Sequence, residues 1–145
     1  MKNILYIFLL VSSTLFLGSC SNDKDNDGPE IEIIKPDENE VVLTGTNLNM
    51  KFRFKDEYGI YNFVYQIYHE DSEIEGRFTY STEIIFNEIV TSFETSRTVL
   101  IPLMKSETIP TAPGNYILRV ISTDIYNNRT IAERKFIVQQ SVEKE

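Results

Sequence analysis

The chain has 145 residues, with 22 acidic and 14 basic side chains, one histidine, one cysteine and no tryptophan. A formal net charge of -8 argues against a nucleic-acid-binding protein, because phosphates would repel such a surface. A single cysteine excludes an intrachain disulfide and a zinc site built from cysteine pairs. The length fits one domain with a modest core.

Residues 1–19 have the features of an export signal. Lys2 gives a basic start, and a largely apolar run from Ile4 to Leu17 follows. This run is shorter than the roughly 20 apolar residues that a membrane-spanning helix needs. We therefore predict that residues 1–19 are a signal peptide.

The only cysteine follows this segment directly. The sequence Leu-Gly-Ser before Cys20 resembles the lipobox at which bacterial lipoprotein signal peptidase cuts in front of a cysteine. The resemblance implies that Cys20 becomes the mature N-terminus and carries a diacylglyceryl thioether and an N-acyl chain such as palmitate. Several acyl chains hold a protein at a membrane far more firmly than one. Cys20 is therefore the predicted lipidation site of an outer-membrane lipoprotein.

Residues 20–28 are polar and rich in aspartate after the cysteine. Such a segment cannot offset its ordering entropy by burial, so we predict a flexible acidic tether. It resembles the acidic signal that follows the cysteine in surface-exposed lipoproteins of Bacteroidota, which implies display on the cell surface. An EF-hand-type calcium loop that starts at Asp23 is the alternative, but its twelfth position, which must be acidic, is Ile34.

From residue 29 to residue 140 the sequence alternates apolar and polar side chains in short runs, the period typical of strands. The run 48–55 is the clearest, and the turn at 56–59 is expected to end it. The run 60–69 places Tyr61, Phe63, Tyr65 and Ile67 on one face, which we expect to be core. Further strands are expected over 30–34, 40–43, 77–80, 83–90, 97–103, 116–123 and 130–139, followed by a polar tail over 141–145.

These strands predict an all-β domain over residues 29–140: an immunoglobulin-like antiparallel β-sandwich of about seven strands. Tyr116 lies two residues after Gly114, at the start of a strong strand. This position predicts a tyrosine corner, in which the phenol hydroxyl bonds a nearby backbone group and holds the chain reversal.

Five short motifs are spread over the predicted domain: Pro29-x-Ile31, Asp56-Glu57-Tyr58-Gly59-Ile60, Ile101-Pro102, Pro113-Gly114-x-Tyr116 and Asp124-x-x-Asn127-Asn128. Their order resembles an uncharacterised family of Ig-like lipoproteins from Bacteroidota, over most of residues 29–139. Members of that family often carry several histidines after the third strand, which implies metal binding in that region.

His69 is the residue that matches those histidines here, and Glu70 and Asp71 follow it. These three side chains are the candidate metal ligands, an oxygen-rich set that suits calcium better than copper or zinc. We favour the other interpretation of this loop, a solvated hairpin without a cofactor, whose charges discourage edge pairing. A similar choice applies to Asp56, Glu57 and Asp124, which could be calcium ligands at one end of the sandwich or belong to Asx turns, and we favour the turns.

Tyr58, Tyr68 and Tyr126 are the candidate contact residues for a ligand, because they fall in turns or on the polar face of a strand. The chain has no nucleophile elbow, no phosphate-binding glycine loop and no paired acids in a recognisable context. We therefore predict a protein that is not an enzyme.

The leading interpretation is a surface-anchored outer-membrane lipoprotein that acts as a non-enzymatic Ig-like binding or accessory module. Its predicted partners are the membrane, through the lipid anchor, and an extracellular glycan, a protein ligand or a neighbouring transporter, with no nucleic acid. Two alternatives stay open. One is a lipoprotein that binds calcium or a transition metal through the loop after the third strand, and the other is a structural spacer or adhesin subunit.

Overall fold

The computed structural model describes residues 26–141, so the predicted signal peptide, Cys20, most of the tether and most of the polar tail lie outside it. Six strands form the described part: β1 (Glu30–Lys35), β2 (Glu40–Leu43), β3 (Asn47–His69), β4 (Tyr80–Leu100), β5 (Gly114–Asp124) and β6 (Arg129–Gln139). Within residues 26–141 no helix is long and apolar enough to cross a membrane.

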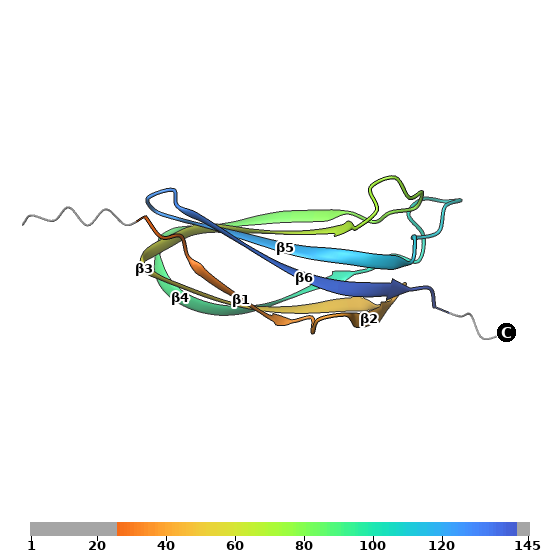
Figure 1. Ribbon diagram of the computed structural model, residues 1–145, viewed down its shortest axis with the longest axis horizontal. Coiled ribbons are helices and arrows are strands. Elements are labelled where there is room, and N and C mark those ends of the chain that lie inside the picture. Colours follow the sequence, from red (N-terminus) through yellow and green to blue (C-terminus); the bar gives the residue numbers. More distant parts are fainter. Residues whose placement is uncertain (1–25, 142–145) are drawn as a thin grey trace, which may run out of the picture.

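The domain is elongated, with its two described termini at opposite ends (Figure 1). At one end, called the near end, the described chain enters β1, the strand β3 bends, and the turn between β5 and β6 is found. The far end is the one where β3 finishes at His69 and the chain leaves β6. The two ends carry different chemistry.

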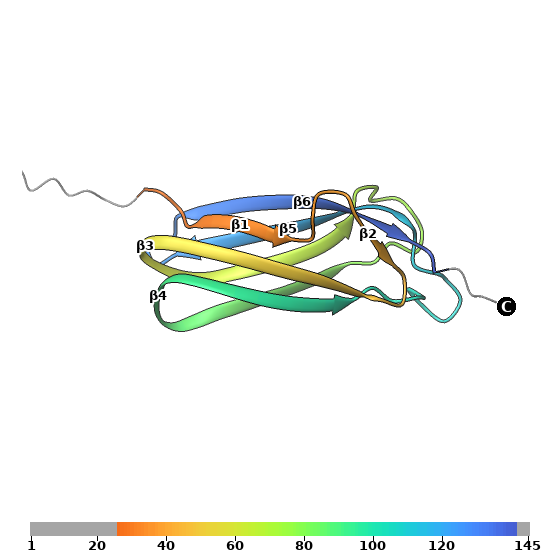
Figure 2. The same cartoon turned by 90° about the horizontal axis from the view of Figure 1, so that it is seen from below.

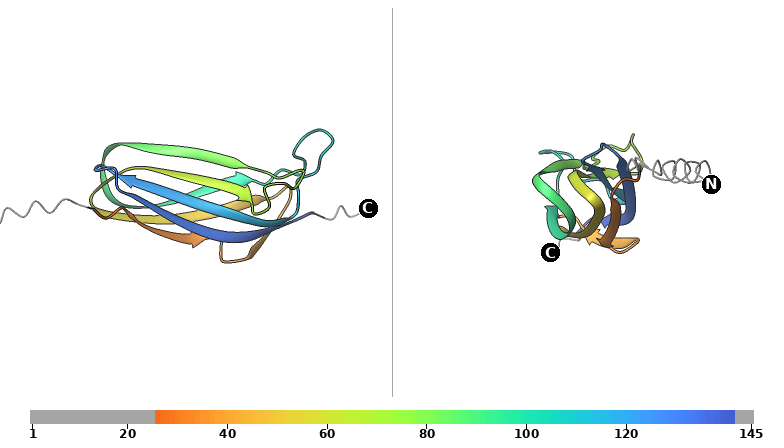
Figure 3. Two further views of the ribbon diagram at one scale, coloured as in Figure 1. Left: turned by 45° about the horizontal axis from the view of Figure 1, so that its top comes forward. Right: turned by 90° about the vertical axis from the view of Figure 1, so that its left-hand side faces the viewer.

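The strands β3 and β4 form one long antiparallel ribbon that bends midway and contributes to both layers of a sandwich (Figure 2). In one layer, residues 47–55 of β3 pair with β1 on one side and with β4 on the other. In the second layer, residues 60–69 of β3 lie between β4 and β5, and β6 and β2 complete the sheet. The end-on view in Figure 3 shows the strands arranged around the core. The predicted immunoglobulin-like β-sandwich is confirmed, with one parallel pair, β2 and β6.

The structure has six strands rather than about seven because predicted interruptions lie within longer strands. The turn expected at 56–59 lies inside β3. The pieces expected over 83–90 and 97–103 fall in the single strand β4 as far as Leu100, and only Tyr80 of the piece expected over 77–80 belongs to it. Pairing between β3 and β4 is irregular from Lys55 to Ile60. Gly59 supplies a positive φ of 133° at this bend, a conformation that L side chains rarely adopt.

Alternate residues of β3 fill the core between the layers. Leu48, Phe52 and Phe54 are fully buried, as the period of two predicts for 48–55. Phe54 packs against Phe63 and Phe93, with ring centres 4.8 and 4.6 Å apart. Each buried phenylalanine stabilises the fold by roughly 1.5–3 kcal/mol. In a chain without tryptophan, this cluster supplies much of the buried aromatic area.

One residue of the predicted core face lies on the surface. Phe63, Tyr65 and Ile67 are buried as expected, but Tyr61 is 48 % exposed. The register of β3 shifts between Ile60 and Asn62 against both neighbouring strands. Such an irregularity exchanges the two faces of a strand, so the prediction for Tyr61 is wrong.

The predicted tyrosine corner is confirmed at the far end. Tyr116 is fully buried at the start of β5, and its hydroxyl donates a hydrogen bond to the carbonyl of Ala112 at 2.9 Å. The same oxygen accepts a hydrogen bond from the Phe78 N–H at 3.3 Å. Burial raises the pKa of the Tyr116 hydroxyl. The corner therefore joins the loop before β4 to the loop before β5.

Candidate functional site

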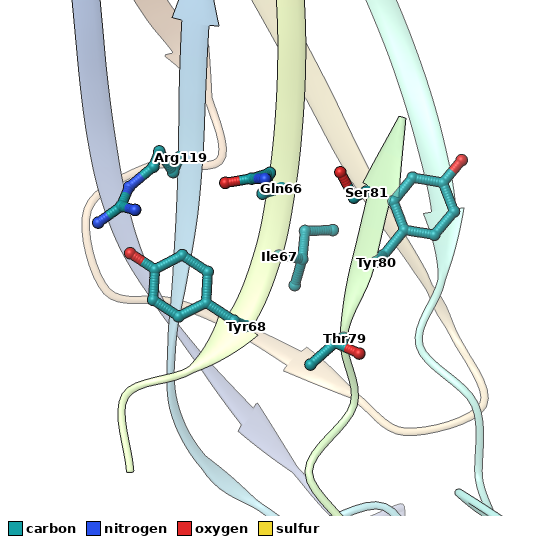
Figure 4. Close-up of a pocket in the computed structure, with 7 residues that line it drawn as sticks. All are labelled: Gln66, Ile67, Tyr68, Thr79, Tyr80, Ser81 and Arg119. Atoms are coloured by element: carbon teal, nitrogen blue, oxygen red, sulfur yellow. The ribbon is translucent and has the colours of Figure 1, made fainter. Parts of the chain in front are cut away.

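An open cleft of about 360 Å³ lies on the outer face of the second layer, near the far end. Gln66 and Tyr68 come from β3, and Arg119 comes from β5. Gln66 is paired directly with Arg119 in the β3–β5 ladder, so these side chains share one face of the sheet. Residues 79–81, at the start of β4, line the other side of the cleft (Figure 4).

Glu133 holds the two largest polar side chains of this cleft in place. One of its oxygens accepts hydrogen bonds from Arg119 Nε at 2.6 Å and from the Tyr68 hydroxyl at 3.2 Å. The guanidinium carbon of Arg119 lies 5.1 Å from the centre of the Tyr68 ring, within cation–π range. The ring and the cation are thus positioned before any ligand arrives, which lowers the entropic cost of binding.

The surroundings of Glu133 and Tyr68 shift the pKa values of both side chains. The hydrogen bond from Arg119 is the main reason that the pKa of Glu133 lies below its usual value. Burial is the main reason that the pKa of Tyr68 lies above its usual value. Glu133 therefore keeps its charge, and Tyr68 its proton, across the neutral range.

The side chains of the cleft suit reversible binding. A guanidinium, an amide and hydroxyl groups donate and accept hydrogen bonds, and the Tyr68 ring offers a flat apolar surface. The sequence predicted Tyr68 as a contact residue but not Gln66 or Arg119. The alternation of apolar and polar residues along each strand predicts that Gln66 and Arg119 both face the solvent. Only the register between β3 and β5 shows that they lie beside each other.

The other two predicted contact residues, Tyr58 and Tyr126, lie together at the near end, ten residues along β3 from Tyr68. Their ring centres are 5.7 Å apart in an edge-to-face arrangement. They are 38 % and 58 % exposed. The structure thus unites two of the three predicted tyrosines and separates them from the third.

Two buried aspartates shape the loops that carry these rings. Asp56 accepts hydrogen bonds from the N–H groups of Tyr58 at 2.9 Å and Gly59 at 2.6 Å. Asp124 accepts them from the N–H groups of Tyr126 at 2.8 Å and Asn128 at 2.7 Å. The Asx-turn bonds expected from the sequence are therefore present. Each aspartate holds the backbone of the tyrosine two residues after it.

His69 ends β3 at the far end and is 8 % exposed. The Asp71 N–H donates to its Nδ1 at 2.9 Å, so we infer that Nε2 carries the proton and donates to the Pro113 carbonyl at 3.3 Å. The ring also packs edge-on against Tyr116, with centres 4.8 Å apart. Both ring nitrogens of His69 therefore serve the fold.

Glu70 and Asp71 are engaged with other partners. Glu70 forms an ion pair with Lys135 at 2.6 Å, the main reason that the pKa of Glu70 lies below its usual value. Asp71 accepts a hydrogen bond from the Glu73 N–H at 2.9 Å. In the described range 26–141, no three histidine, cysteine or acidic side chains gather as a ligand set. The geometry gives no support to the predicted metal site at His69, Glu70 and Asp71.

No family model and no curated protein matches the chain. Among solved structures, a fibronectin(III)-like module of Clostridium thermocellum CbhA is 13 % identical over 78 % of this chain and 98 % of its own, with a TM-score of 0.45. A β-glucosidase from Listeria innocua, in complex with glucose, is 9 % identical over 79 % of this chain but 16 % of its own, with a TM-score of 0.43. Murine CRIg is 10 % identical over 79 % of this chain and 98 % of its own, with a TM-score of 0.39. These values are too low to carry an argument about function.

Proposed function

We propose that this chain is a surface-anchored outer-membrane lipoprotein whose Ig-like domain acts as a non-enzymatic binding or accessory module. On this proposal it belongs with the Ig-like lipoproteins of Bacteroidota that its motifs resemble. The observation that carries the binding role is the preorganised pair of Tyr68 and Arg119 in the cleft on the outer sheet face.

The proposed ligand of the cleft is an extracellular glycan. A sugar ring presents an apolar face that stacks on an aromatic side chain, and its hydroxyls pair with amide and guanidinium groups of the kind that Gln66 and Arg119 supply. The cleft lies near the far end, whereas the described chain begins at the near end. An anchor at Cys20 therefore leaves the cleft directed away from the membrane.

The anchor is tested by acylation of the full chain in a Gram-negative host. We expect the protein to incorporate an alkyne-tagged fatty acid, and Cys20→Ser to abolish the label because the thioether cannot form. Equal labelling of the two proteins would contradict the anchor at Cys20.

The ligand class is tested on a glycan array, followed by affinity measurement for any sugar that binds. Tyr68→Ala removes the stacking surface and should weaken binding at least about tenfold, the size of a modest hot spot. Tyr61→Ala is the matched control, because Tyr61 is a half-exposed tyrosine of the same strand outside the cleft. Equal affinity of Tyr68→Ala and the wild type would contradict this role of the cleft.

A further inference from the structure

The near end carries a continuous exposed apolar surface, here called the tyrosine tip: Tyr58, Ile89, Ile125 and Tyr126. Ile89 is 72 % exposed and Ile125 44 %. A Cβ atom placed on Gly59 would lie 2.8 Å from Ile89 Cγ2 and 3.6 Å from Ile125 Cγ2, so the two isoleucines flank this glycine. Tyr58 precedes the glycine, and its ring meets that of Tyr126. Grouped exposed apolar side chains of this kind mark interaction surfaces.

The tyrosine tip has a fixed shape. Asp56 and Asp124 hold the two loops from inside, as described above, and the Ile125 N–H donates a hydrogen bond to the Gly59 carbonyl at 3.0 Å. This last bond joins the bend of β3 to the β5–β6 turn. The apolar side chains are therefore displayed by loops whose backbone groups are already satisfied.

The chain enters the domain beside this surface. Glu30 pairs with Lys55, the residue before Asp56, and Gly28 lies against Arg129 and Thr130 at the start of β6. Figures 1 and 2 show the first described residues at the same end as the β5–β6 turn. Residues 20–28 span at most roughly 32 Å even when fully extended. Since β5 alone is roughly 37 Å long, an anchor at Cys20 keeps the near end within reach of the bilayer and allows the far end to lie well away from it.

We propose that the tyrosine tip docks on the lipid bilayer that holds the anchor, so that the domain stands on the membrane in one orientation. This inference rests on the proposed acylation of Cys20. Tyrosine rings favour the headgroup level of a bilayer because one edge is polar, and isoleucine side chains favour the acyl boundary. The anchor raises the effective concentration of the tip at the surface, so weak insertion is sufficient.

The charges around the tip determine which lipids it favours. Asp56 and Asp124 are buried and accept hydrogen bonds from backbone N–H groups. Among the exposed charged residues of this end, the glutamates Glu30, Glu57 and Glu88 outnumber the cations Lys55 and Arg129. Anionic headgroups would repel this net negative charge. Docking therefore depends on apolar insertion, and we expect it to weaken as the fraction of anionic lipid rises.

The test uses the full acylated chain in phosphatidylcholine vesicles. Acylation occupies the thiol of Cys20, so Tyr126→Cys supplies a unique site for an environment-sensitive fluorophore. Leu103→Cys is the matched control, because Leu103 is 56 % exposed and packs near Gly45 at the far end. We expect a blue shift and a loss of fluorescence with headgroup-level spin-labelled lipids at position 126, and neither effect at position 103.

A second pair of variants measures the contribution of the apolar side chains, with the fluorophore kept at position 126. Ile89→Asp should restore most of the fluorescence, because a carboxylate resists insertion. Val41→Asp should leave the quenching unchanged, since Val41 is 50 % exposed on β2, away from the near end. Both substitutions are at exposed positions, so neither threatens the core.

The outcomes separate the tip from the anchor. An acylated protein whose two probes are quenched equally, or not at all, overturns docking and leaves the anchor intact. Equal quenching in Ile89→Asp and Val41→Asp overturns docking as well. A full chain that carries no acyl label overturns the anchor, and with it this inference.

Discussion

The near and far ends of the sandwich use similar residues in opposite ways. At the far end, the aromatic rings of Tyr116 and His69 are buried and their polar atoms bond the backbone of neighbouring loops. At the near end, aspartates do the bonding and the rings of Tyr58 and Tyr126 stay exposed. A tyrosine that stabilises the fold and a tyrosine that is available to a partner therefore differ by the burial of the ring, not by residue type.

The packing role of His69 is not visible in the local sequence. A single imidazole followed by two acids suggests a metal site, and nothing in the local sequence reveals that the loop before β5 returns to the ring. Pro113 supplies the carbonyl that meets Nε2, and a Cβ on Gly114 would come within 2.6 Å of the same nitrogen. The loops of the far end are thus packed around His69, while those of the near end display the rings of Tyr58 and Tyr126 outward.

The largest expected effect is at Asp124, which holds the near end. Asp124 is 1 % exposed, and Asp124→Ala removes the acceptor of the part-buried Tyr126 and Asn128 N–H groups and of the Asn128 side-chain amide, so we expect the free energy of unfolding to fall by about 3 kcal/mol. Urea unfolding followed by circular dichroism measures the change. Asp37→Ala, at an exposed position, is the control, and a similar result for the two variants would contradict the structural role of Asp124.

The tyrosine corner is expected to have the next largest effect. Tyr116→Phe removes the hydroxyl that bonds Ala112 and Phe78, and we expect a loss of about 2 kcal/mol. Tyr126→Phe removes the same group from an exposed ring at the near end and should change stability by less than about 0.5 kcal/mol. The same unfolding measurement compares them, and equal effects would remove the distinction between the two ends.

The last effect is absent at neutral pH and appears only at alkaline pH. Burial, together with a hydrogen bond to Tyr80, raises the pKa of Tyr65 to about 12, and burial also raises that of Tyr116. Unfolded tyrosines lose their protons near pH 10, so the unfolded state binds fewer protons than the folded state above that value. The stability that these buried groups contribute is therefore complete below about pH 10 and falls as the pH rises towards about 12.

Unfolding free energies measured across this alkaline range test the effect. Tyr65→Phe should flatten the decline, because a phenylalanine has no proton to lose. Tyr58→Phe, at the exposed near end, serves as the comparison. A decline as steep in Tyr65→Phe as in the wild type would contradict the shifted titration.

Much of the fold could be predicted because it depends on local patterns. Alternation over 48–55 identified the buried face, and the spacing of Gly114 and Tyr116 identified the corner. The continuity of β3 through residues 56–59 was missed because its turn-forming residues also suit a bend inside a strand. Tyr61 was misplaced because a register shift is a property of two paired strands and leaves no mark in one of them.

The sequence by itself determined the alternating runs, the sandwich class and the predicted export signal and lipidation site, since period-two alternation and a terminal apolar run are local features. Only the tertiary structure brought Arg119 beside Tyr68, Tyr126 beside Tyr58, and Pro113 against His69. Each of these contacts joins residues far apart in the chain. They depend on which strands pair and in what register, and the burial of the shared core fixes both.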